Sequence, residues 1–92
     1  MSTEVKINAI LIDGGDDVAT LLCDVGDHEP VAWDQEGYVI AHEAIPEGHK
    51  VALRDIDEGD VVLKYGHPIG KASCYIARGE HVHTHNLARE ES

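Results

Sequence analysis

The chain has 92 residues, the length of one domain, and carries a formal net charge of −11. This charge argues against a nucleic-acid surface, which needs clustered Lys and Arg, and equally against binding to an anionic membrane. A membrane span needs roughly 20 apolar residues, and no segment approaches that length. We therefore expect no membrane-spanning segment. The chain lacks Phe, and its apolar residues are mainly the aliphatic ones that suit pleated strands.

The start of the chain predicts a β-hairpin. Residues 5–12 partly alternate and end at Asp13-Gly14-Gly15-Asp16, a strong turn signal. Residues 18–23 follow as a second strand, with a single helical turn over 16–21 as the alternative. No window shows sustained 3.6-residue periodicity, so no long helix is expected.

The next stretch is polar and acidic. Residues 24–37 predict a long loop around a short extended piece near Val31, and residues 37–41 restore a strand. Cys23 and Cys74 lie far apart and form no metal or redox motif. Because no secretory signal precedes them, we expect reduced thiols and a cytoplasmic protein.

The second half contains an internal repeat of the form I-x-x-G-x-x-V. In each copy Ile anchors the loop, Gly takes a positive-φ turn position, and the last residue begins an inward-facing strand. The uneven spacing excludes a solenoid and predicts a compact β domain with tight loops. The copies are Ile45 to Val51, Ile56 to Val62 and Ile76 to Val82.

Three histidines alternate near the end of the chain. On an extended strand, His81, His83 and His85 share one face, with neighbours about 7 Å apart and the outer pair about 13 Å apart. Two adjacent imidazoles can ligate one metal ion or grip a small anion, although a surface strand can also carry histidines for solvation alone. The remaining histidines have no spacing partner and are predicted to be surface or interface residues: His28, His42, His49 and His67.

Any acidic substrate requires local positive charge, because the chain as a whole repels anions. The candidates are Lys50, Arg54, Lys64 and Lys71, and each is equally compatible with an ordinary solvated side chain.

Three segments together resemble the SAF domain of the altronate/galactarate dehydratase family, which includes the small subunits of sulfolactate sulfo-lyases. They are Ile45 to Ile56 (IPEGHKVALRDI), Lys64 to Ala72 (KYGHPIGKA) and Gly79 to Asn86 (GEHVHTHN). The resemblance implies a mostly β fold, the β-clip, with short strands, long loops and little helix. It assigns residues 1–86 to a single SAF domain and residues 87–92 to a C-terminal tail.

The resemblance also implies lyase chemistry on sugar acids. The chain would be the small subunit or N-terminal domain of a metal-dependent dehydratase, inactive without a large catalytic subunit, with Fe(II) or Mn(II) as the metal. We expect the His motif and nearby cations to contact metal or substrate at the interface with that subunit. The metal candidates are His83 and His85, with His81 in addition, and the substrate-binding candidates are Lys50, Arg54, Lys64 and Asn86.

Several alternatives remain open at this point. The chain could belong to a sulfolactate sulfo-lyase, or it could be a non-catalytic module that binds a sugar acid or holds an assembly together, and it could form a homo-oligomer. A cupin-type metal site is a weaker alternative, because its further ligands would fall beyond this C-terminus.

Overall fold

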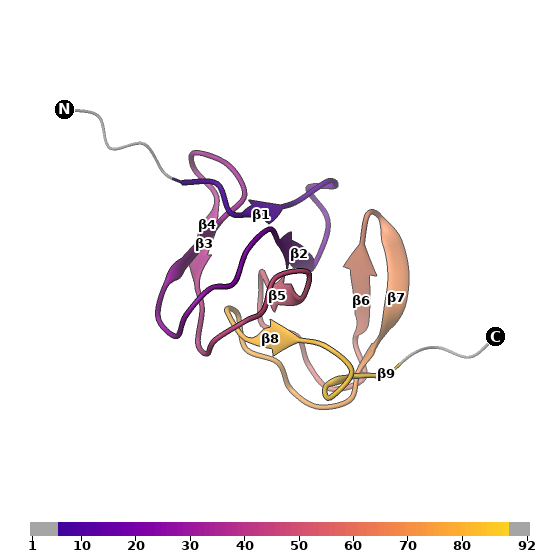
Figure 1. Cartoon of the computed structure of the whole chain (residues 1–92). Coiled ribbons are helices and arrows are strands. Elements are labelled where there is room, and N and C mark those ends of the chain that lie inside the picture. The colour runs from indigo at the N-terminus through magenta and orange to yellow at the C-terminus, as the bar shows by residue number, and fades with distance from the viewer. Residues whose placement is uncertain (1–5, 89–92) are drawn as a thin grey trace.

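The computed structural model describes residues 6–88, which form nine short strands and no helix (Figure 1). Within this range no helix could therefore cross a membrane. The predicted mostly β fold with short strands is confirmed. The strands are β1 (Ala9–Ile10), β2 (Val18–Leu21), β3 (Pro30–Ala32), β4 (Tyr38–Ile40), β5 (Lys50–Ala52), β6 (Val61–Lys64), β7 (His67–Ala72), β8 (His81–Val82) and β9 (Leu87–Ala88).

The strands pair antiparallel in three small sheets. Their orders are β1-β2-β5-β8, β3-β4 and β6-β7-β9. The predicted N-terminal hairpin is present as β1 and β2, with Ala9 opposite Leu21, although β1 has only two residues. Residues 18–21 form a strand rather than a helical turn, because β2 pairs with β1 on one side and β5 on the other. Residues 87 and 88, expected in the tail, form β9.

The repeat has four copies, one more than the sequence pattern indicated. Residues 25–31 form the additional copy, with Val25 in place of Ile and His28 in place of Gly. His28 has φ 66°, in the same left-handed region as Gly48 at 83°. The first residues of the copies bridge in pairs, Val25 with Ile45 and Ile56 with Ile76.

Two hydrophobic clusters fill the interior, and they consist largely of equivalent positions of the repeat. Residues in the first cluster have counterparts in the second cluster 31 positions later along the chain. Leu21 thus corresponds to Ala52 and Val51 to Val82, all of them buried. The equivalent members are Val25, Val31 and Ile45 in the first cluster and Ile56, Val62 and Ile76 in the second.

Two buried carboxylates anchor the hairpin of β6 and β7. Asp17 accepts a 2.8 Å hydrogen bond from the backbone N–H of Leu63. Asp16 accepts two more, from Tyr65 at 2.7 Å and Gly66 at 2.8 Å. Both turn residues have positive φ, 56° and 75°. This anchoring fixes the end of β6 beside β2.

Candidate functional site

The histidine motif does not form the extended strand predicted for it. Strand β8 ends at Val82, and residues 83–86 form a turn. Asn86 explains the turn, because its side chain accepts a hydrogen bond from the His83 N–H at 3.0 Å and donates one to the His81 carbonyl at 2.8 Å. The prediction of one straight strand face was therefore wrong, since a side-chain clamp bends the backbone after Val82.

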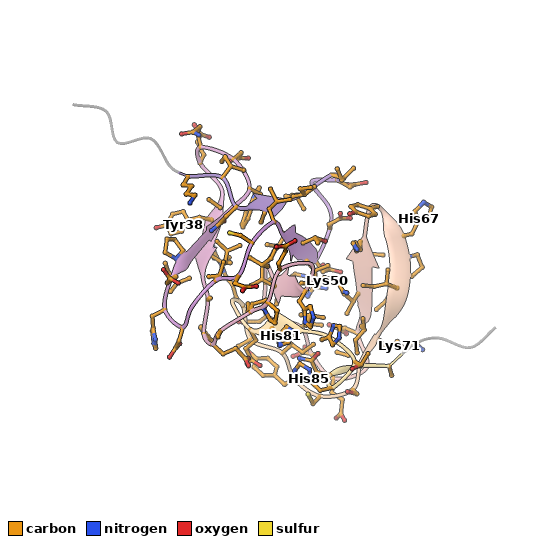
Figure 2. All side chains as sticks on the ribbon, in the orientation of Figure 1. Tyr38, Lys50, His67, Lys71, His81 and His85 are labelled. Carbon is orange, nitrogen blue, oxygen red and sulfur yellow. The ribbon has the colours of Figure 1, made fainter. Side chains whose placement is uncertain are left out.

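The turn nevertheless gathers the imidazole rings. The ring centroids of His81 and His85 lie 5.1 Å apart, far closer than a straight strand allows. His49 joins them from the position just before β5, with its ring stacked 3.9 Å from that of His83. Its Nδ1 lies 2.7 Å from Nε2 of His81. Figure 2 shows Lys50, His81 and His85 in the same part of the molecule.

His49 was expected to be a surface or interface residue without a partner, and the absence of a partner was wrong. In the other three copies an acidic side chain at the fifth position, Glu29, Asp60 or Glu80, accepts a hydrogen bond from the N–H of the second residue. Pro46 occupies the second position of the remaining copy and has no N–H to donate. His49, at the fifth position, is thereby released to face β8. This departure from the repeat is the sequence signal that could have identified it.

His49, His81 and His83 make a set of donors that fits a metal ion. One ring nitrogen from each lies within 4.8 Å of the others, and all three side chains are half-buried. Burial lowers the pKa of His81, and the nearby rings of His49 and His85 lower it further. Burial, His49 and a neighbouring lysine lower the pKa of His83 in the same direction. His81 and His83 are thus favoured as neutral imidazoles, which are the form that ligates metals.

Two of the predicted substrate-binding residues lie beside this cluster. Lys50 and Lys64 line a hollow of about 270 Å³ together with His83 and Thr84. The Lys64 ammonium also lies 4.8 Å from the centre of the Tyr65 ring. Burial lowers the pKa of Lys50, and the charge of Lys64 lowers it further. The acidic chain thus concentrates positive charge at one place next to the histidines.

The other two predicted substrate-binding residues are engaged within the fold. Arg54 donates to Asp17 at 2.6 Å, an ion pair that raises the pKa of the guanidinium, and to the Asp55 carbonyl at 2.9 Å. Asn86 is only 3% exposed and uses its amide to hold the turn. The structure therefore joins two lysines to the histidines, and it gives Arg54 and Asn86 contacts that support the backbone.

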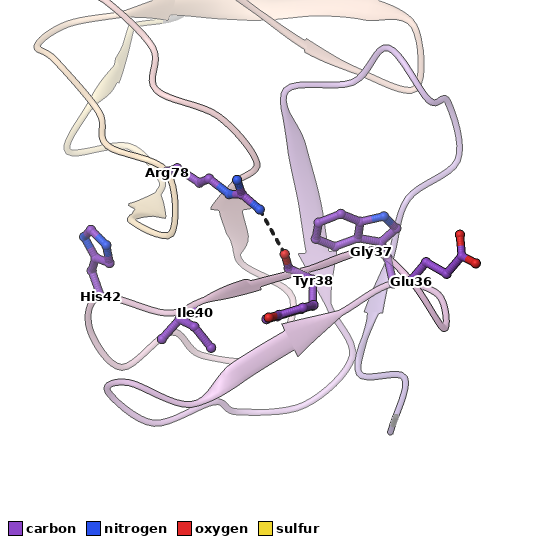
Figure 3. A pocket seen from close by; sticks show the side chains of 7 residues that line it. Glu36, Gly37, Tyr38, Ile40, His42 and Arg78 are labelled. Atoms are coloured by element: carbon purple, nitrogen blue, oxygen red, sulfur yellow. Dashed lines mark hydrogen bonds between the residues drawn. The ribbon is translucent and has the colours of Figure 1, made fainter. Parts of the chain in front are cut away.

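Another hollow lies away from the histidine site. It has a volume of about 450 Å³ beside β4 and is lined by Trp33, Tyr38, Ile40, His42 and Arg78, among others (Figure 3). Arg78 donates to the Tyr38 carbonyl at 3.1 Å. None of the residues predicted to bind metal or substrate reaches it.

Comparison with known proteins shows the family of the chain. Residues 7–90 match the model of the altronate/galactarate dehydratase SAF domain. The chain is 42% identical over 82 residues to altronate dehydratase of Escherichia coli, covering 89% of this chain and 15% of that enzyme. It is 51% identical over 45 residues to the (2R)-sulfolactate sulfo-lyase subunit alpha of Chromohalobacter salexigens, covering 49% of this chain and 48% of that subunit.

The corresponding subunit of Paracoccus pantotrophus is 55% identical over 42 residues, which cover 46% of this chain and 63% of that subunit. The chain thus spans less than two thirds of each of these relatives, and it is homologous to parts of lyases. The predicted resemblance is confirmed: the chain belongs to the altronate/galactarate dehydratase SAF domain family.

Proposed function

We propose that this chain is the SAF part of a metal-dependent lyase that dehydrates a sugar acid, and that it works together with a larger catalytic region. The observation that supports this most is the group formed by His49, His81 and His83, whose nitrogens converge within 4.8 Å. Three imidazole ligands suit iron better than manganese, which prefers oxygen ligands. We therefore expect Fe(II) at this cluster.

The chemistry of dehydration indicates what the metal and the residues of this chain would each contribute. Dehydration of a 2,3-dihydroxy acid removes the proton next to the carboxylate and expels the neighbouring hydroxyl. A divalent metal held by the histidines would supply Lewis acidity toward the oxygens of the acid. His49, His81 and His83 would hold that metal. Asn86 fixes the turn that carries His83, and Pro46 leaves His49 free to face β8.

The larger catalytic region would supply the general base and acid. The described part of the chain places no carboxylate among the three converging donors, and Glu43 only approaches them, accepting a long 3.4 Å bond from the His81 N–H. The identity shared with sulfo-lyase alpha subunits supports a second candidate, elimination from sulfolactate in place of a sugar acid.

The test is to express the chain together with the large catalytic region of its own lyase and to assay altronate, galactarate and sulfolactate. Conversion of one of these is expected, and we expect His49→Ala and His83→Ala to lower it at least about 100-fold because each removes a metal ligand. His67→Ala is the matched control, because this exposed histidine lies on β7 outside the cluster.

Direct Fe(II) titration under anaerobic conditions, with Co(II) as a spectroscopic substitute, gives a readout that is independent of turnover. The wild-type chain and His67→Ala are expected to bind one ion, and the two cluster variants are expected to bind none. Unchanged metal binding by the cluster variants would refute the metal site. Full activity without this chain would identify it as a non-catalytic module.

A further inference from the structure

We propose that Lys50 and Lys64, with His83 and Thr84, form an anion site that takes a carboxylate group of the substrate. The site is the hollow of about 270 Å³ next to the histidine cluster. The identity of the anion as a sugar acid rests on the proposed function, whereas the anion site itself rests on the charges and contacts described below.

The first argument is a missing counter-ion. The chain has 18 Asp and Glu residues against seven Lys and Arg, so a lysine that needs a carboxylate partner has many available. Yet among residues 6–88 neither Lys50 nor Lys64 has an ion pair; the ion pairs there are His28 with Asp27 and Arg54 with Asp17. The two lysines are half-buried and carry like charges that repel each other, and a bound anion relieves that repulsion.

The second argument is that both lysines belong to strands whose backbone is held in place. Lys50 lies in β5, between β2 and β8. Lys64 is the last residue of β6, immediately before the turn whose backbone N–H groups donate to Asp16. A site on anchored strands loses little conformational freedom when it binds a ligand, which favours affinity for small molecules.

The third argument is the lining of the hollow. Ile69 and Leu87 contribute the apolar part of its lining. Apolar walls lower the local dielectric constant, so a carboxylate is attracted more strongly there than at an open surface. His83 borders both the hollow and the histidine cluster. A 2-hydroxy acid bound by the lysines would therefore present its hydroxyl toward the histidines. The arrangement therefore selects 2-hydroxy acids over neutral polyols.

The experiment titrates the chelator-treated, metal-free chain with galactarate and with galactitol, which has the same carbon skeleton without carboxylates. Nuclear magnetic resonance shifts of the backbone amides report binding. Saturable shifts at residues 50, 64, 83 and 84 are expected with galactarate alone. Lys50→Met and Lys64→Met should each weaken binding at least about tenfold, the usual loss for a charge-assisted contact. Lys71→Met, which removes the same charge outside the hollow, should leave the affinity unchanged.

Absence of galactarate binding by the wild-type chain would overturn the anion site, as would equal binding of galactitol or unchanged affinity in both Met variants. Spectra of the variants without ligand establish that they are folded, and either lysine suffices for the test if the other variant does not fold. A separate Co(II) titration distinguishes the two proposals. Metal binding without anion binding refutes only the anion site, and anion binding without metal binding refutes only the metal site.

Discussion

Replacing Asn86 with Ala should destabilise the fold and displace the turn that carries His83. The substitution removes the bonds of 3.0 and 2.8 Å that the buried amide makes to the backbone of residues 83 and 81. Each is worth about 1 kcal/mol net, and the buried groups left unpaired add to the cost, so we expect a loss of about 2–4 kcal/mol. In a small domain with about 5–15 kcal/mol of stability, this corresponds to a fall in Tm of roughly 10–25 °C.

Urea denaturation monitored by the fluorescence of Trp33, the single tryptophan, measures this loss. Thr84→Ala is the control, because this side chain is exposed in the same turn and its removal should change stability by no more than about 0.5 kcal/mol. A loss below about 0.5 kcal/mol in Asn86→Ala, or unchanged Co(II) affinity in that variant, would refute the assignment of Asn86 as the residue that positions the cluster.

Three further predictions concern the repeat. The double variant Pro46→Ala/His49→Glu restores the usual acidic contact of the repeat, so thermal unfolding should show unchanged or higher stability while Co(II) binding is lost; a severe loss of stability would contradict this account of the repeat. Gly79→Ala should cost several kcal/mol in urea denaturation because the new Cβ would contact a β4 carbonyl oxygen, whereas Gly48→Ala meets open space and should cost only about 1 kcal/mol for its positive φ. His28→Gly should raise the free energy of unfolding by about 1 kcal/mol, since φ 66° disfavours a side chain, and a decrease would show that the ring contributes contacts that outweigh this strain.

Much of the fold could be predicted because its determinants are local. The hairpin of β1 and β2 follows from alternation that ends at a Gly-Gly turn, and the corners at Gly48, Gly59 and Gly79 follow from glycine three positions after an isoleucine. The copy at residues 25–31 could not be predicted from the pattern, because His28 takes the positive-φ conformation that glycine takes in the other three copies. Local pattern identifies a turn by its usual residue and misses one that is held by its surroundings.

The candidate site could be predicted only in part because its contacts are distant in sequence. His49 and His81 are 32 positions apart and meet because β5 pairs with β8. The turn after Val82 depends on a side chain, Asn86, that the alternating pattern did not reveal. The bonds from Asp16 and Asp17 to the end of β6 place Lys64 near Lys50, and a contact with Asp17 occupies Arg54. Spacing along the chain encodes neither outcome.

The fold presents the same structural corner four times, and this redundancy has an evolutionary consequence. Three corners keep an acidic residue that closes the loop, so they suffice to maintain the architecture. The corner at Pro46 no longer needs that residue, which leaves one position free to vary without loss of folding. A duplicated scaffold of this kind can acquire reactive groups at a spare corner, so selection for chemistry and selection for stability act on separate copies of one motif.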